Sequence, residues 1–249
     1  DAGLSEAEAR KNIFAVDKDG LLVEGMPGIR RAQEPFVQSR SAVADWRLKN
    51  PSQITLLDVV NNVRPTALIG VSGQAGAFTE DVIRTMAAGV ERPIIFPLSN
   101  PTSRSEASAD DLIAWTEGRA LIGTGSPFRS VKWQGRQMAI DQTNNSYIFP
   151  GMGLGILAVS ARRVTDAMFA AAARCLADLS PSRVNKSGRL LPAVSEIRSV
   201  AFEVAKAVAG QAIADGLAMP VDEPGLESRI RDHMWNPDYL PYRYIESMS

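Results

Sequence analysis

Apolar and polar residues follow one another in blocks that predict strands and helices in turn. Residues 66–71 form a short apolar run that is entered through Arg64-Pro65, and a glycine-rich turn, an amphipathic segment and a second apolar run at 94–98 follow it. A short apolar run bounded by turn residues is typical of a parallel strand buried on both faces. The stretch 66–102 therefore predicts one strand, helix and strand unit, around which the rest of the chain is organised.

The ends of these predicted elements carry residues suited to ligand binding. The first strand runs into the glycine turn 70–76, Thr79 is a good N-cap for the helix, and the second strand stops at Asn100. In an open α/β sheet, ligands bind outside the carboxyl ends of the strands. We therefore expect the glycine turn and Asn100 on one binding edge.

An earlier apolar run ends in a carboxylate. Residues 13–16 predict a short buried strand that ends at Asp17, before a tight turn containing Asp19-Gly20. An acidic residue at the tip of an apolar strand is the second half of a dinucleotide-binding fingerprint, whose glycine-rich first half lies about 20 residues upstream. Too few residues precede Asp17 for that first half, so we expect a truncated chain. The alternative for Asp17 is a turn residue that caps its own backbone.

The remaining patterns extend the predicted sheet and add helices around it. A crossover helix is expected from 51 to 62, a helix capped by Ser108 over 109–116, a strand at 120–124 and a hairpin around Gly135. The strand at 120–124 again ends in small residues. Three successive strands thus finish in Gly, Ser or Asn, which strengthens the prediction of a binding edge.

The last third of the chain is predicted to be helical. Glycines alternate at 151, 153 and 155 behind Pro150, which indicates close backbone approach, either to a ligand or to another helix. Helices with apolar stripes are expected at 165–179 and 195–214, and one short helix after Gly216. We predict an α/β fold, a Rossmann-like parallel sheet flanked by helices within residues 1–160, and a helical tail over 161–249. Exposed aromatics at the end of that tail (Trp235, Tyr239, Tyr242 and Tyr244) favour docking onto a neighbouring chain.

Composition excludes several classes of function. The 249 residues carry a net charge of −1 and no run rich in Lys or Arg, which argues against a nucleic-acid partner. No apolar run is long enough to span a bilayer and no signal peptide is visible, so a cytoplasmic protein without a membrane partner is expected. The one cysteine, Cys175, is predicted to be a small core residue.

Few titratable residues suggest chemistry of their own. The only histidine, His233, lies in the tail helix and is expected at the surface. Glu106, Asp110 and Asp141 lack metal-ligand spacing, and we interpret them as caps or solvated charges. The pattern therefore predicts no metal site in this chain.

Four motifs follow one another along the chain, at residues 68–74 (LIGVSGQ), 96–102 (FPLSNPT), 125–128 (GSPF) and 144–151 (NNSYIFPG). With WTEGR at 115–119 between them, this ordered series closely resembles the malic enzyme family. The resemblance covers about residues 3–242, and bacterial NAD-linked malic enzymes look most similar.

The resemblance implies a reaction and a division of labour. Such enzymes oxidise malate and decarboxylate it to pyruvate with a nicotinamide cofactor and Mg²⁺ or Mn²⁺, usually as homo-oligomers. Their catalytic tyrosine and lysine and their metal-binding carboxylates lie before the part aligned with this chain, which would then contain no catalytic residue. Carried over by position, Asp17 would contact the adenosine ribose, Val71, Ser72 and Gly73 would line the cofactor groove, and Asn100 and Asn145 would bind nicotinamide and malate.

Alternatives remain at this point. Asn100 and Asn145 can be plain turn amides. The whole protein can be a malolactic enzyme of the same family, and the isolated chain can be a non-catalytic dinucleotide-binding module. For the cofactor, Asp17 favours NAD, because a carboxylate accepts from a ribose 2′-hydroxyl and repels a 2′-phosphate. Gln33 occupies the position where NADP-linked members of the family tend to carry lysine.

Overall fold

The computed structural model describes residues 3–50, 52–184, 189–239 and 241–242, and the chain divides into two compact units, Asp1–Asn144 and Asn145–Ser249. The sequence pattern predicts a division near residue 160 instead. The difference concerns one helix, α5 (Phe149–Ala158), which packs against helices of the second unit.

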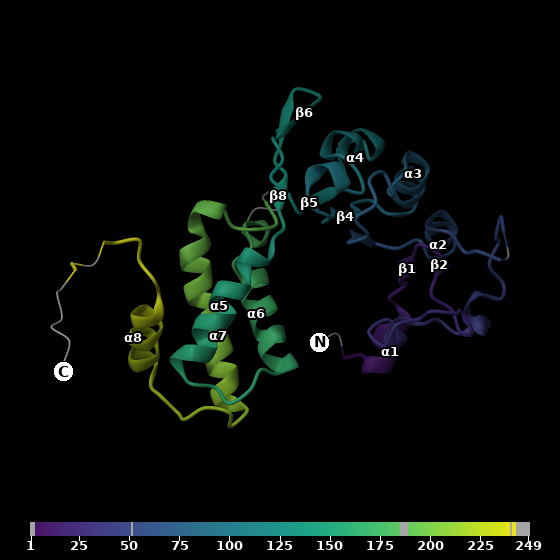
Figure 1. Ribbon diagram of the computed structural model, residues 1–249. Coiled ribbons are helices and arrows are strands. Elements are labelled where there is room, and N and C mark those ends of the chain that lie inside the picture. The colour runs from purple at the N-terminus through teal and green to yellow at the C-terminus, as the bar shows by residue number, and fades with distance from the viewer. Residues whose placement is uncertain (1–2, 51, 185–188, 240, 243–249) are drawn as a thin grey trace. The chain divides into compact units, whose positions relative to one another are not determined.

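The first unit is built on a parallel sheet, as predicted. Its strands are β3 (Ala67–Gly70), β4 (Ile94–Pro97), β5 (Leu121–Thr124) and β8 (Asp141–Gln142), hydrogen-bonded in that order. Helices α2 (Leu56–Val63), α3 (Glu80–Gly89) and α4 (Ala109–Trp115) accompany the sheet (Figure 1). Strand β8 was not expected, because a pair of residues is too short to leave a pattern.

Local signals place the helices of this unit. The side chain of Thr79 accepts a hydrogen bond from the Val82 amide at the start of α3, and Ser108 caps α4 in the same way through the Asp111 amide. The apolar positions of α3 are buried against the sheet residue Ile95. These predictions are confirmed, but α2 begins at Leu56, later than expected, because Thr55 and Asp58 form a capping box there.

Burial of the first strand differs from the prediction. Leu68 of β3 is buried, whereas Ile69 on the opposite face is 59% exposed. Leu68 belongs to the core cluster of this unit, whereas Ile69 does not, so the Leu68 face of β3 is the one that packs into that core. The expectation that residues 66–71 are buried on both faces was therefore wrong.

The start of the chain forms a hairpin instead of a buried strand. Strand β1 (Val16–Asp17) pairs antiparallel with β2 (Gly20–Leu21), after helix α1 (Glu6–Lys11) with its Ser5 capping box. Val16 and Asp17 are exposed, and Leu21 alone of this hairpin belongs to a small cluster with Val43, Ile54 and Val59. Two further short hairpin strands, β6 (Val131–Trp133) and β7 (Arg136–Met138), turn through Gly135 as predicted.

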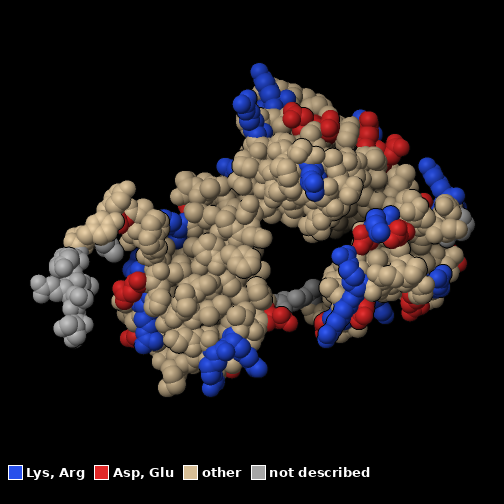
Figure 2. Space-filling model, viewed as in Figure 1, with Lys and Arg blue, Asp and Glu red and all other residues tan. Residues whose placement is uncertain are grey.

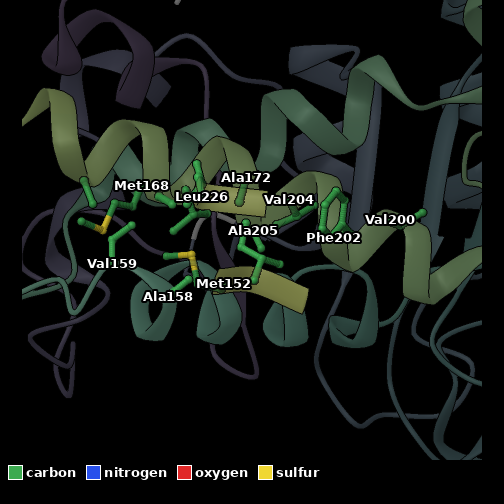
Figure 3. Packing of buried hydrophobic residues seen from close by; sticks show 14 of the residues in the cluster. Met152, Ala158, Val159, Met168, Ala172, Val200, Phe202, Val204, Ala205 and Leu226 are labelled. Carbon is green, nitrogen blue, oxygen red and sulfur yellow. The ribbon is translucent and has the colours of Figure 1, made fainter. Parts of the chain in front are cut away.

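The second unit is helical and centres on α7 (Ile197–Ala214). Helices α5, α6 (Asp166–Asp178) and α8 (Glu223–His233) pack with it. The predicted apolar stripe of α7 is buried at Val200, Val204 and Val208, whereas that of α6 is buried only at its centre, at Met168 and Ala172, and ends in the exposed Val164 and Leu179. Figure 3 shows Met152, Met168, Val204 and Leu226 meeting in this core. Short 3₁₀ turns connect the larger elements of the two units: Glu34–Phe36, Arg40–Val43, Thr102–Arg104, Asn145–Tyr147, Pro181–Arg183 and Val194–Glu196.

The alternating glycines of α5 are explained by helix packing. A Cβ added to Gly151 would lie 2.6 Å from Val204 Cβ, and one added to Gly155 would lie 2.6 Å from the Ala205 carbonyl oxygen, both on α7. A Cβ on Gly153 would meet nothing within 4 Å. Of the two alternatives left by the sequence, approach to another helix is the one observed for Gly151 and Gly155.

The cysteine and the terminal aromatic residues of the tail were also singled out in the sequence. Cys175 is partly buried and packs against the helical core, and burial together with Glu203 and Asp178 raises the pKa of its thiol, as suits a core residue. Trp235, Tyr239 and Tyr242 are exposed, whereas Tyr244 lies outside the described residues. Docking of these aromatics onto a neighbouring chain stays a prediction. Across the described ranges, every helix is too short or too polar to cross a membrane.

Candidate functional site

The carboxyl edge of the parallel sheet brings the glycine turn beside the segment that ends β4. Gly70 pairs in register with Pro97, and the Leu98 amide donates to the Gly70 carbonyl at 2.8 Å. Beyond the strands, the Gly73 amide donates to Ser99 Oγ at 2.8 Å. The predicted site residues Val71, Ser72, Gly73 and Asn100 thus lie on two adjacent strand ends.

The third strand end joins the same edge through Ser126. The Ser126 hydroxyl hydrogen-bonds to the Asn100 side-chain oxygen, and the Gly125 amide donates to the Pro97 carbonyl at 3.3 Å. A Cβ on Gly125 would lie only 2.2 Å from the Leu98 carbonyl oxygen, so glycine permits this close approach. With its oxygen bound by Ser126, the Asn100 amide offers its NH₂ group as a donor. Small residues at this strand end are visible in the sequence, but no sequence signal singles out Ser126.

The edge combines an apolar contact with polar groups. Val71 is 78% exposed although its side chain is apolar, and Asn100 is exposed beyond it. A flat heteroaromatic ring with a polar substituent can pack on the valine and accept from the amide. This arrangement suits the binding of such a ring.

Glu106 differs from the prediction of a cap or solvated charge. It is fully buried, not solvated, and its carboxylate accepts from the Ser72 amide and hydroxyl, both at 2.8 Å, and from the Ser99 hydroxyl and amide. Burial acts to raise the pKa of Glu106, but the hydrogen bonds from Ser99 and Ser72 outweigh it, so the pKa lies below its ordinary value. The carboxylate is therefore charged at neutral pH.

Asp17 lies on the β1-β2 hairpin, outside the parallel sheet. Its Oδ1 accepts from the Lys18 amide at 2.8 Å, and its Oδ2 accepts from Gln33 Nε2 at 2.6 Å and from the Arg30 guanidinium at 3.1 Å. The Lys18 amide first, then Gln33 and Arg30, hold the pKa of Asp17 below its usual range. Asp17 caps its own turn and still keeps a half-exposed carboxylate. Figure 2 shows basic and acidic side chains close together over the part of the molecule that carries β1 and β2.

Asn145 belongs to the second unit. It begins the 3₁₀ turn Asn145–Tyr147, and its carbonyl accepts from the Ile148 amide at 3.0 Å, while its side chain is exposed. The expectation that Asn145 and Asn100 face one ligand stays a prediction.

Among the residues that the structure describes, no group of three or more His, Cys, Asp or Glu side chains comes together to hold a metal ion. Asp110 is an exposed charge in the first turn of α4, as predicted. Asp141 is buried in β8, so its interpretation as a solvated charge was wrong. His233 is exposed at the end of α8, where Nδ1 lies 2.8 Å from the Arg229 carbonyl oxygen.

Comparison with protein families gives a match over most of the chain. Residues 1–213 match the family model described as "Malic enzyme, NAD binding domain". Among curated proteins, the chain is 49% identical over 243 residues to an NAD-dependent malic enzyme of Acinetobacter baylyi and 48% identical over 241 residues to one of Photorhabdus laumondii. These alignments cover 98% and 97% of this chain but only 43% and 42% of those relatives. The chain thus spans less than half the length of the curated relatives it matches.

Solved structures give the same fold. A malic enzyme of Entamoeba histolytica superposes with a TM-score of 0.65 at 25% identity, covering 90% of this chain and 43% of its own. A malic enzyme from Pyrococcus horikoshii superposes with a TM-score of 0.62 at 21% identity, which shows likeness of fold alone. The Rossmann-like α/β prediction is confirmed.

Proposed function

This chain belongs to the malic enzyme family, and on that premise we propose that it is the NAD-binding part of an enzyme that converts malate and NAD⁺ to pyruvate, CO₂ and NADH. The observation that carries the proposal is the near-complete alignment of this chain with NAD-dependent malic enzymes at about half identity. In this reaction the hydride of malate passes to the cofactor, and the carboxyl group leaves as CO₂.

The residues of this chain would bind and orient the reactants. Val71 would support the nicotinamide ring, and Ser72 and Gly73 would shape the groove beside it. Asn100, its oxygen held by Ser126, would donate from its NH₂ group to a carboxylate or carboxamide oxygen. Asn145 is proposed for the same ligand. A neutral amide suits this task because it fixes a geometry without adding charge beside the hydride acceptor.

Asp17 and its neighbours support NAD as the cofactor. A half-exposed carboxylate can accept from both hydroxyls of the adenosine ribose, and its lowered pKa keeps it charged. Gln33 adds an amide and no charge. Arg30 lies in the same cluster, and its guanidinium could pair with the 2′-phosphate of NADP. The preference for NAD over NADP therefore depends on the balance between the charges of Asp17 and Arg30.

The divalent metal of the proposed reaction does not fit the residues described in this chain, which lack a suitable cluster of ligands. We therefore derive no step through a metal here, and we propose that the chain alone is inactive. Cytoplasmic location and assembly into a homo-oligomer belong to the same proposal.

The proposal is tested with the full-length gene product and with the 249-residue chain. We expect NADH formation from malate, NAD⁺ and Mn²⁺ by the former and none by the latter. Asn100→Ala should lower kcat/KM for malate at least tenfold, whereas Asn61→Ala, which removes an exposed amide from α2, should change it less than twofold. Turnover by the isolated chain, or equal effects of the two substitutions, would contradict the assignment.

A further inference from the structure

The hydrogen bonds of Glu106 join two loops that are distant in sequence. Oε1 accepts from the Ser72 amide, the Ser72 hydroxyl and the Ser99 hydroxyl, and Oε2 accepts from the Ser99 amide at 3.3 Å. Ser72 follows β3 and Ser99 follows β4, so one carboxylate holds both strand ends. Hydrogen bonds to a charged acceptor are stronger than neutral ones, and those from Ser99 are buried while those from Ser72 are partly buried.

The two serines pass this constraint on to the glycine turn. Ser99 Oγ accepts from the Gly73 amide at 2.8 Å, and Ser72 Oγ accepts from the Gln74 amide at 3.1 Å. Each serine hydroxyl therefore donates to Glu106 and accepts from the backbone of the turn. Three successive amides, of Ser72, Gly73 and Gln74, are satisfied inside the protein by this one carboxylate and its serines.

This arrangement changes what the glycine turn can do. In a phosphate-binding loop, successive backbone amides point at the anion. Here the amides point at Glu106 or at serines bound to it, and a buried negative charge lies behind them. The turn is thus unsuited to cradling the cofactor's pyrophosphate and suited to presenting a fixed surface.

Gly70 gives the carboxylate its room. A Cβ on Gly70 would lie 2.6 Å from Glu106 Cδ and 2.7 Å from Glu106 Cγ. The φ angle of Gly70 is not in the left-handed region, so the reason for glycine is this close approach and not the turn. The last residue of β3 and the buried carboxylate thus form one unit.

We propose that Glu106 is the positioning residue of this edge, an internal anion that fixes the turn 71–74 and the segment 98–100 in the arrangement that receives the cofactor. It acts through Ser72 and Ser99 and does not itself touch a ligand. The role of the edge as a cofactor site rests on the function proposed above, whereas the fixing of the two loops does not.

The test compares Glu106→Gln with a matched control, Asp58→Asn, in the 249-residue chain for hydrogen exchange and in the full-length gene product for NADH affinity. Asp58 is likewise buried and accepts from a backbone amide and a hydroxyl, those of Thr55, but it caps α2. Amide hydrogen exchange is followed by NMR, and NADH affinity is measured by fluorescence titration. In Glu106→Gln, we expect at least tenfold faster exchange at Ser72, Gly73 and Gln74 and at least fivefold weaker NADH binding, with the amides of α3 unchanged. Asp58→Asn should leave the turn and the affinity as in wild type.

A milder variant keeps the test decisive if Glu106→Gln does not fold. Ser99→Ala removes the acceptor of the Gly73 amide, so exchange should rise at Gly73 and much less at Gln74. Unchanged exchange at the turn in both variants, or the same change in Asp58→Asn, would overturn the inference. If the full-length wild type binds no NADH while exchange rises as expected, the positioning role stands and the proposed cofactor function fails.

Discussion

Replacing Gly155 by alanine should destabilise the packing of α5 on α7. Two effects on the free energy of unfolding oppose each other. Alanine in a helix interior is favoured over glycine by about 0.5–1 kcal/mol. The new Cβ, however, would lie 2.6 Å from the Ala205 carbonyl oxygen and 3.0 Å from Val208 Cβ, and backbone on a packed helix cannot rotate away. Overpacking of this kind costs about 1–3 kcal/mol. We expect a net loss of about 1–2 kcal/mol.

Gly153 provides a control within the same helix, two residues away. A Cβ there would meet no atom within 4 Å, so Gly153→Ala keeps only the gain in helix propensity and should stabilise the unit by about 0.5–1 kcal/mol. At roughly 4 °C or more per kcal/mol for a unit of this size, the melting temperatures of the two variants should differ by about 8 °C. Thermal unfolding of the 249-residue chain followed by circular dichroism at 222 nm measures this. Equal melting temperatures, or a more stable Gly155→Ala, would refute the account of α5 and α7.

Three further predictions concern the first unit. Gln33→Lys in the full-length protein should shift the ratio of the kcat/KM values for the two cofactors toward NADP⁺, by an amount equivalent to about 1–2 kcal/mol, since a cation would face the 2′-phosphate. An unchanged ratio would show that Gln33 lies outside the site, and a wild type that prefers NADP⁺ would overturn the NAD assignment. Ser126→Ala removes the hydrogen bond that orients Asn100, so kcat/KM should fall by an amount equivalent to about 0.5–1.5 kcal/mol of activation free energy. The melting temperature should change little, and an unchanged kcat/KM would contradict that role of Ser126. The pKa of Glu106 is lower in the folded chain than in the unfolded chain, so the charged carboxylate contributes its full stability above the unfolded pKa and loses it as pH falls through the folded pKa. The urea midpoints of wild type and Glu106→Gln should therefore converge in acid. A difference between the two midpoints that does not depend on pH would contradict this.

Signals that act over a few residues could be predicted from the sequence. Thr79 and Ser108 cap their helices as expected, because N-capping needs only the residue and the next three amides. The ends of β3, β4 and β5 meet at one edge as expected, because parallel strands of consecutive units align their carboxyl ends.

Features that depend on distant partners could not be predicted. Glu106 reads as a solvated charge because its partners lie 7 and 34 residues away, and only the serines at two strand ends, with Gly70 before one of them, hint at a shared acceptor. The run 13–16 has the composition of a buried strand, but it leads into a hairpin with short strands and Val16 remains exposed. β-Propensity describes the residues themselves, whereas their burial depends on what packs against them in the fold.

The ratio of pyruvate to NADH formed from malate and NAD⁺ by the full-length gene product with Mn²⁺ tests the central claim most directly. Oxidation and decarboxylation coupled in one enzyme yield one pyruvate for each NADH, and the account predicts that ratio. Lactate without net NADH would mean that the enzyme is malolactic. Absence of any product, with the protein folded and the metal present, would contradict the assignment of this chain to the cofactor-binding part of a malate-oxidising enzyme.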